Sequence, residues 1–347
     1  MEHEVTKDQT LLNDQGLVKE PGWARRPVWL YERTRIHAPW FRVKEWDYYL
    51  FNTDEFAVAF TISDLGYIGL LSVSYIDLVN GCEHTESELV LFPRGKKFGL
   101  GTKVSDVNAT CQTKRLSMSF EKTSEGRRIL CDFKDFNKAE GKDFHADLKI
   151  KEPQMEAVYI ATPWKEKPTA FYYNCKMNCL TAEGTVTYGD VNKAVTFDNC
   201  AGVLDWGRGV WTYDNTWFWG TGSGRIGSEL FGFNLGYGFS DRSSASENGF
   251  YYKGRIHKLE EVSFDIPLDK DGKRRFMEPW TVNSKDGRLK STFKPIIDRN
   301  ACMDFKLIIS DQHQVFGKLS GSFVTDDGET IEFKDFICAL EVVRNKY

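Results

Sequence analysis

Short segments in which apolar and polar residues alternate, separated by turn signals, run through most of this chain. Residues 45–51 and 56–62 fit two strands around a polar turn at 52–55, and residues 144–150 alternate strictly. The dipeptides Asp271-Gly272, Asp286-Gly287 and Asp327-Gly328 are typical of hairpin turns. Helical periodicity is scarce, and residues 79–91 are the best candidate for a short helix. The sequence therefore predicts an all-β protein with few helices.

The 347 residues exceed the usual size of a single domain and favour two β units. We expect residues 1–33 to form an extended N-terminal arm, residues 34–170 a first β-barrel-like domain, and residues 171–347 a second one carrying the pocket. A Pro- and Lys-rich stretch at 161–168 places the boundary. Each half opens on a strand rich in Trp and Tyr, at 46–51 and 217–219, which suggests a duplication. Because antiparallel strands must hide their edges, each unit should be a barrel or sandwich.

Composition argues against several classes of partner. The 46 basic and 50 acidic residues give a formal net charge of −4, so no basic face for nucleic acid is expected. No apolar run approaches the roughly 20 residues of a membrane-spanning helix, and the N-terminus is too polar for a secretory signal. The eight cysteines are scattered, so we expect free thiols in a cytoplasmic protein. No metal-binding spacing is present, no cofactor is predicted, and the oligomeric state is open.

Residues 201–252 are unlike the rest of the chain, because large aromatic residues alternate there with glycines. Glycine in a strand lets a ligand approach closely, and Trp and Tyr rings provide apolar walls with a hydrogen-bonding edge. The segment therefore predicts a ligand pocket. Asp205 and Glu247 are the candidate catalytic carboxylates. The candidate ligand-binding residues are Trp206, Arg208, Trp211, Trp217, Trp219, Asn234 and Tyr237.

A structural interpretation competes with this one. The aromatic residues would be core, the glycines would be bulges or barrel corners, and Asp205 with Arg208 would be an ion pair that locks a strand crossing. Residues 222–227 match the GxGxxG string of dinucleotide-binding folds. That motif needs a following helix, whereas strand-like residues follow here, so we predict no dinucleotide site.

Four blocks resemble an uncharacterised family called domain of unknown function 2804. They lie at residues 17–24, 62–69, 202–211 and 234–238, and the Leu-Asp-Trp-Gly-Arg-Gly block at 204–209 is the most specific. A more distant resemblance is to the tandem lipocalin-like proteins around carotenoid 1,2-hydratase and tocopherol cyclase. It implies two lipocalin-like antiparallel β units packed together and an apolar substrate. Those proteins often carry an Asp-His-Asn-Trp-Gly stretch. Here Asp205-Trp206-Gly207 lacks the His and Asn, so Asp205 alone corresponds as a catalytic residue.

Three functions fit these residues. The first is binding of a mainly apolar small molecule, with acid–base catalysis of hydration, isomerisation or cyclisation by Asp205. In that case Asn234 and Glu247 would orient a polar end of the ligand. The second is a carbohydrate-active protein in which Asp205 and Glu247 are paired carboxylates and aromatic rings stack on sugars. The third is a carrier or scaffold without catalysis, whose carboxylates are fully paired.

Overall fold

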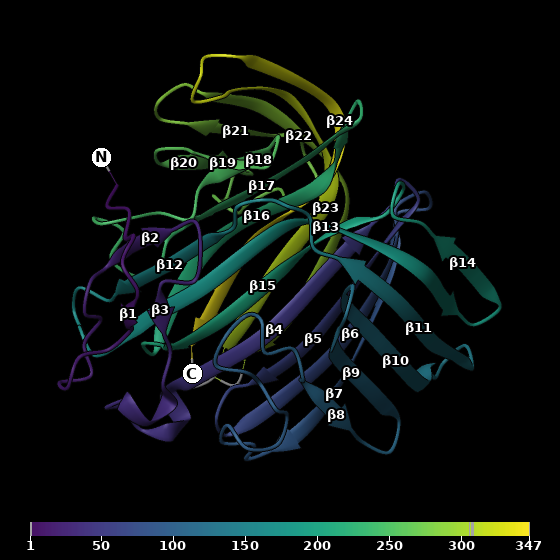
Figure 1. Cartoon of the computed structure of the whole chain (residues 1–347). Coiled ribbons are helices and arrows are strands. Elements are labelled where there is room, and N and C mark those ends of the chain that lie inside the picture. Colours follow the sequence, from purple (N-terminus) through teal and green to yellow (C-terminus); the bar gives the residue numbers. More distant parts are fainter. Residues whose placement is uncertain (1, 305, 307–308, 347) are drawn as a thin grey trace.

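The structure is a computed structural model that describes residues 2–346 apart from 305, 307 and 308, and most of these lie in strands (Figure 1). The described residues contain no α-helix; two 3₁₀-helical turns, η1 (Arg33–Arg35) and η2 (Trp40–Arg42), precede the main sheets. The expected all-β class is confirmed. The N-terminal segment contributes the short parallel pair β1 (Gln9–Thr10) and β3 (Trp29–Leu30).

The first large sheet is antiparallel and curled. Its strands are β2 (Gly22–Ala24), β4 (Val43–Asn52), β5 (Phe56–Asp64), β6 (Ile68–Asp77), β7 (Cys82–Leu91), β8 (Thr110–Gln112), β9 (Leu116–Thr123), β10 (Gly126–Asn137), β11 (Lys142–Lys151), β12 (Val158–Pro163), β13 (Phe171–Tyr188), β14 (Val191–Val195) and β15 (Ala201–Val210). They are ordered β7-β6-β5-β4-β15-β13-β11-β10-β9-β8, with β2, β12 and β14 to the side. The rings of Phe60 and Phe144, from strands far apart in this order, lie 6.1 Å apart, so the sheet folds back on itself.

The second large sheet is also antiparallel and curled. Its strands are β16 (Asp214–Ile226), β17 (Glu229–Tyr237), β18 (Gly249–Tyr252), β19 (Arg255–Lys258), β20 (Val262–Asp265), β21 (Trp280–Ser284), β22 (Leu289–Asp304), β23 (Ile309–Val324) and β24 (Thr330–Lys346). They are ordered β19-β18-β17-β16-β24-β23-β22-β21-β20. The ring of Phe250 on β18 lies 4.3 Å from that of Phe323 on β23, across the inside of the curl.

The chain changes sheet between Val210, where β15 ends, and Asp214, where β16 begins. Strands β13 and β15 lie beyond the expected domain boundary at residue 170, yet both are hydrogen-bonded into the first sheet. Their pairing with β4 and β11 joins residues 171–210 to the strands that precede them. The division into domains at 170 stays a prediction.

The short helix expected at residues 79–91 is wrong. The segment contains β7, which pairs with β6 from Cys82 opposite Asp77 to Leu91 opposite Ile68. Side-chain hydrogen bonds reinforce the pairing: Thr85 donates to Ser74 (2.9 Å), and Ser87 donates to Ser72 (3.0 Å). The cross-strand ladder outweighs a weak local helical pattern.

Three hydrophobic clusters hold the molecule together. One lies within the curl of the first sheet and one within the curl of the second. The third joins the outer faces of the two sheets and consists of Leu50, Ala57, Ala59, Ile76, Leu78, Val203, Phe316, Ile337 and Ala339. The outer face of β4 therefore meets the second sheet, and any space left between them is bounded by both.

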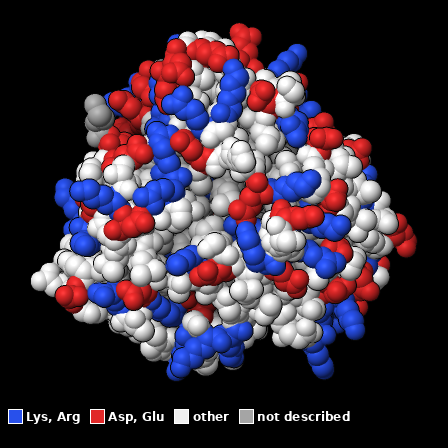
Figure 2. All heavy atoms as spheres, in the orientation of Figure 1, with Lys and Arg blue, Asp and Glu red and all other residues white. Residues whose placement is uncertain are grey.

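Several expectations from composition bear on the whole molecule. Figure 2 shows acidic and basic side chains interspersed over one face, as the near-balanced charge predicts. All eight cysteines are free, six of them buried. Among the described residues, no helix has the length and apolar character needed to cross a membrane, and no group of three or more His, Cys, Asp or Glu residues is arranged to hold a metal ion.

Candidate functional site

A cavity of about 600 Å³ lies between the two sheets. Its walls come from β4, β5, β6, β7, β13 and β15 of the first sheet and from β16, β22, β23 and β24 of the second. The cavity thus lies outside the two curls, on the faces that the third hydrophobic cluster joins. Most of the lining is apolar or aromatic, with a small set of carboxylates, cations and amides, which is the composition of a small-molecule site.

The period of two along each strand decides which side chains reach this space. On β4, Lys44, Trp46 and Tyr48 line the cavity, whereas Glu45 and Asp47 between them point to the other face, where they contact Tyr31 and Arg208. On β16, Trp217 and Trp219 both line the cavity, whereas Phe218 packs against the second core. The aromatic residues of 201–252 therefore contribute to the cavity wall, whereas no glycine of that segment lines it.

Asp205 lines the cavity and is held by three donors. Lys176 Nζ lies 2.6 Å from its Oδ2. Asn174 Nδ2 donates to Oδ1 (2.7 Å), and Trp46 Nε1 donates to the same oxygen (3.1 Å). Asp205 therefore has three polar partners at the wall of a largely apolar cavity.

The predicted ion pair between Asp205 and Arg208 is wrong. Residues three positions apart on a strand point to opposite faces, so Asp205 faces the cavity and Arg208 faces the first core. Arg208 is fully buried. Its Nη2 lies 3.0 Å from Asp47 Oδ1, and the same nitrogen donates to Gly101 O (2.9 Å). The charge partner of Asp205 is Lys176, which is 29 positions away in sequence and directly opposite on β13.

Glu247 also lines the cavity and shares Lys176 with Asp205. Lys176 Nζ lies 4.0 Å from Glu247 Oε2, and Tyr172 donates its hydroxyl to the same oxygen (3.0 Å). Burial raises the pKa of Glu247, and the Lys176 charge opposes the shift. The two carboxylates predicted from the sequence are therefore brought together, by a lysine that was not predicted.

Glu341 on β24 is a third carboxylate in the cavity. Trp217 Nε1 donates to its Oε1 (2.8 Å), and Gln314 Nε2 donates to its Oε2 (2.8 Å). No Lys or Arg nitrogen of the described residues lies within 4.0 Å of it. Burial raises the pKa of Glu341 and the Asp205 charge adds to the shift, whereas the two hydrogen bonds and the charge of Arg299, another lining residue, oppose it. The cavity thus holds carboxylates in two kinds of surroundings, one neutralised by an ammonium and one contacted by neutral donors.

Of the other residues predicted from the sequence, some line the cavity and others lie outside its lining. Trp211, Trp217 and Trp219 line the cavity. Asn234 lies behind it, where it accepts the Trp219 Nε1–H (2.8 Å) and donates to the Glu247 backbone carbonyl (3.0 Å). Tyr237 does not line it, because its ring stacks on Phe218 in the second core at 4.5 Å.

Trp206 and Arg208 do not line the cavity either. Trp206 is buried in the first core, and the Arg208 guanidinium lies 4.0 Å from its ring centroid. Both point away from Asp205 and Gly207 because they occupy the alternate positions of β15. Trp206 is thus a core residue, as the structural interpretation expected, and Arg208 is buried with Asp47 as its charge partner in place of Asp205.

The sequence pattern did not single out several lining residues. Trp46 and Tyr48 lie in the Trp/Tyr-rich strand that opens the first half. The composition of this strand could have indicated them as lining residues. The others are single polar residues on long strands, and nothing in their neighbourhood marks them: Lys44, Tyr172, Lys176, Arg299, Gln312, Gln314 and Glu341. Only the packing of the two sheets brings them to one space.

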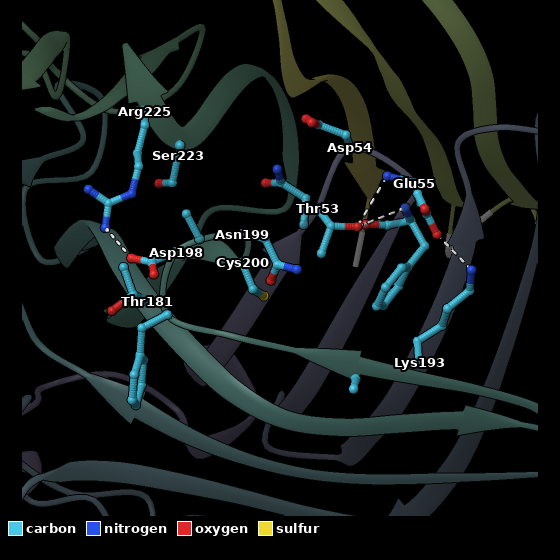
Figure 3. Close-up of a pocket in the computed structure, with 16 residues that line it drawn as sticks. Thr53, Asp54, Glu55, Thr181, Lys193, Asp198, Asn199, Cys200, Ser223 and Arg225 are labelled. Atoms are coloured by element: carbon cyan, nitrogen blue, oxygen red, sulfur yellow. Dashed lines mark hydrogen bonds and ion pairs between the residues drawn. The ribbon is translucent and has the colours of Figure 1, made fainter. Parts of the chain in front are cut away.

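A second, smaller pocket of about 470 Å³ contains none of the predicted residues (Figure 3). It is more polar, and it contains two ion pairs and the exposed Asp54: Lys193 lies 2.7 Å from Glu55, and Arg225 lies 3.7 Å from Asp198. Both pairs lie at the surface, where such pairs are screened by water. This pocket offers no buried charge to direct chemistry.

Similar known proteins identify the fold and the family of this chain. A protein provisionally named AttH from Nitrosomonas europaea has a similar solved structure, with a TM-score of 0.50, 11% sequence identity, and coverage of 92% of this chain and 98% of that one. Kievitone hydratase from Nectria haematococca gives a TM-score of 0.48, 12% identity, and coverage of 88% of each chain. No curated protein matches in sequence. Similarity at these identities concerns the fold alone, and the expected class of two lipocalin-like antiparallel β units packed together is confirmed. The model of the family described as domain of unknown function 2804 matches residues 2–347, and the chain belongs to that family.

Proposed function

We propose that this protein binds a mainly apolar small molecule in the cavity between its two sheets and converts it by acid–base chemistry. The observation that carries the proposal is the pairing of an aromatic, largely apolar space with carboxylates of unlike surroundings. Trp46, Trp217 and Trp219 provide flat apolar walls, and the indole N–H groups of Trp46 and Trp217 donate to Asp205 and Glu341. Two carboxyl groups that share a site but differ in their polar partners are a usual arrangement of an acid and a base.

In this proposal Glu341 is the acid and Asp205 the base. Burial raises the pKa of Glu341, although the Arg299 charge opposes the shift, so Glu341 is assigned the proton donor, and Asp205, which lies 2.6 Å from Lys176 Nζ, is assigned the acceptor. For hydration, Glu341 gives its proton to one carbon of a double bond. Water then attacks the other carbon and loses a proton to Asp205, and solvent returns that proton to Glu341. The faces of the neighbouring indole rings would stabilise the transient cation.

The glycosidase hypothesis receives less support. A glycosidase needs two carboxylates on opposite sides of a bound sugar, with room for the glycosidic bond between them. Asp205 and Glu247 instead contact one lysine ammonium, at 2.6 Å and 4.0 Å. Their shared cation occupies the place in which the substrate would have to lie.

Binding is tested with 1-aminoanthracene, an uncharged apolar fluorophore. Thr61 lines the cavity on β5, so Thr61→Phe fills part of it. Thr292 on β22 is exposed, which makes Thr292→Phe a matched control. We expect saturable binding by the wild type, affinity weaker by about tenfold or more in Thr61→Phe, which is about 1.4 kcal/mol, and a normal affinity in the control. Equal affinity in all three proteins would place the ligand elsewhere.

Catalysis is tested with the compound that copurifies with the protein, identified by mass spectrometry. Glu341→Gln keeps the shape and hydrogen-bonding capacity of the side chain but removes the acid. We expect turnover to fall by roughly 10²–10⁴, with affinity for the compound within a few-fold of the wild type. A wild-type protein that binds the compound and returns it unchanged would instead be a carrier.

A further inference from the structure

Five large apolar side chains are exposed together near one end of the first sheet, and we call them the apolar patch. They are Trp40 (39% exposed), Phe41 (42%), Leu89 (60%), Leu91 (63%) and Phe92 (52%). The Trp40 ring centroid lies 5.8 Å from that of Phe41 and 6.2 Å from that of Phe92, so two segments far apart in sequence form one surface. A single exposed apolar residue is ordinary, whereas a contiguous group marks an interaction surface.

The backbone fixes the outward direction of this patch. Phe92 has a φ of 50°, and its N–H donates to the Tyr67 carbonyl (3.0 Å). A bulky residue with positive φ is uncommon and persists only where the surroundings hold it. Pro93 and Phe98, in the same loop, are buried and anchor it. Phe92 is therefore exposed because the fold holds it there.

The surroundings of the patch are basic. Residues 89–103 contain Arg94, Lys96, Lys97 and Lys103 and no acidic residue, in a chain whose net charge is −4. The Arg94 guanidinium lies 4.3 Å from the Trp40 ring centroid, and that of Arg42 lies 5.7 Å from the Phe41 ring centroid. Exposed Trp, Phe and Leu with flanking Arg and Lys are the composition of a surface that inserts into the headgroup region of an anionic membrane.

The patch is continuous with the cavity. Leu89 belongs to the patch and also lines the cavity, together with Leu65 and Tyr67 behind it. Lys44, another lining residue, donates to the carbonyls of Phe41 (2.9 Å) and Leu65 (2.8 Å) and so ties the patch to the cavity wall. An apolar compound that leaves a bilayer under the patch would therefore meet the cavity without crossing water.

We propose that the apolar patch docks this protein on the surface of a membrane containing anionic lipids. The core of a protein–protein interface is usually depleted in lysine, whereas basic side chains border this patch on both contributing segments. The long apolar stems of these side chains lie along the patch while their charges reach phosphate groups.

The test is flotation with vesicles of phosphatidylcholine alone and vesicles that also contain phosphatidylglycerol. We expect the wild type to float with the anionic vesicles and to be released by salt. The double variant Phe92→Asn with Lys96→Glu keeps a residue that tolerates positive φ, removes the apolar ring and reverses one charge. Its affinity for anionic vesicles should fall by about tenfold or more.

Leu268→Asn with Lys270→Glu is the matched control, because both residues are exposed on the second unit. The control should bind vesicles as the wild type does, and all three proteins should melt alike. Failure of the wild type to float, equal losses in both double variants, or a patch variant that floats normally but loses a copurifying protein would each overturn membrane docking. No cavity ligand enters this assay, so its outcome is independent of the proposed catalysis.

Discussion

At the scale of single residues, Lys44 shows how burial shifts the pKa of a side chain. Its ammonium is buried at the edge of the cavity, donates to two backbone carbonyls and lies 4.6 Å from the Tyr67 ring centroid. Burial lowers the pKa of Lys44 to about 7, and the nearby Arg42 charge adds to the shift while Asp64 opposes it. An unfolded lysine has its ordinary pKa, near 10.4.

This shift predicts a pH-dependent stability. Between about pH 7 and the ordinary lysine pKa, the unfolded chain binds a proton that the folded protein has released, so stability rises with pH in that window by up to about 1.4 kcal/mol per pH unit. Lys44→Met keeps the stem and removes the titration. We expect urea unfolding to show the rise between about pH 7 and pH 9 in the wild type and a flatter profile in the variant. Parallel profiles would mean that Lys44 stays charged.

Sequence reasoning predicted least at the scale of single residues. The types of residue in the site were predictable, because Asp205, Glu247 and the tryptophans stand out in a Gly/Trp-rich segment. Their partners were not predictable, because Lys176 and Glu341 come from strands with no distinguishing pattern. The Asp205–Arg208 hypothesis failed on strand geometry, which places residues three positions apart on opposite faces.

At the scale of elements, β15 shows why a glycine can be required without touching a ligand. Gly207 faces the cavity side of the strand, and the Trp46 indole ring covers it. A Cβ at Gly207 would lie 2.1 Å from the nearest ring carbon. From the sequence, the glycines of this segment are expected to let a ligand approach closely. At Gly207 the close neighbour is another side chain, which in turn donates to Asp205.

Gly207→Ala should therefore displace Trp46 and weaken its hydrogen bond to Asp205. We expect a loss of about 1–3 kcal/mol of folding stability, as for overpacking in general, together with weaker binding of 1-aminoanthracene. Trp46→Ala removes the side chain that clashes. In that background the second change should cost little, and a double-mutant cycle measures the difference. Additive losses would show that the alanine is disfavoured for another reason.

At the scale of the whole molecule, the sequence predicted two β units and the strand pattern within them, because alternation and turns are local properties. It did not predict that the cavity lies between the units. The contacting residues Trp217 and Glu341 are 124 positions apart in the sequence, and Tyr48 and Gln314 are 266 positions apart. Local periodicity carries no information about such pairings, and the place of the site follows from them.

Because both sheets build the cavity, the packing between them should control ligand affinity. Phe316 on β23 is buried in the third cluster, two residues from the lining residue Gln314. Phe293 on β22 is equally buried, but in the core of the second sheet. Either change to alanine should cost roughly 3–5 kcal/mol of folding stability, the usual loss for a buried phenylalanine.

The two variants should differ in binding, measured with 1-aminoanthracene under conditions in which both are folded. Phe316→Ala leaves a void between the sheets and lets the cavity walls shift, so affinity should fall by about tenfold, or about 1.4 kcal/mol. Phe293→Ala disturbs a core that does not line the cavity, so affinity should stay near the wild-type value. Equal losses would attribute the effect to general destabilisation. An unchanged affinity in Phe316→Ala would show that the cavity keeps its shape without the third cluster.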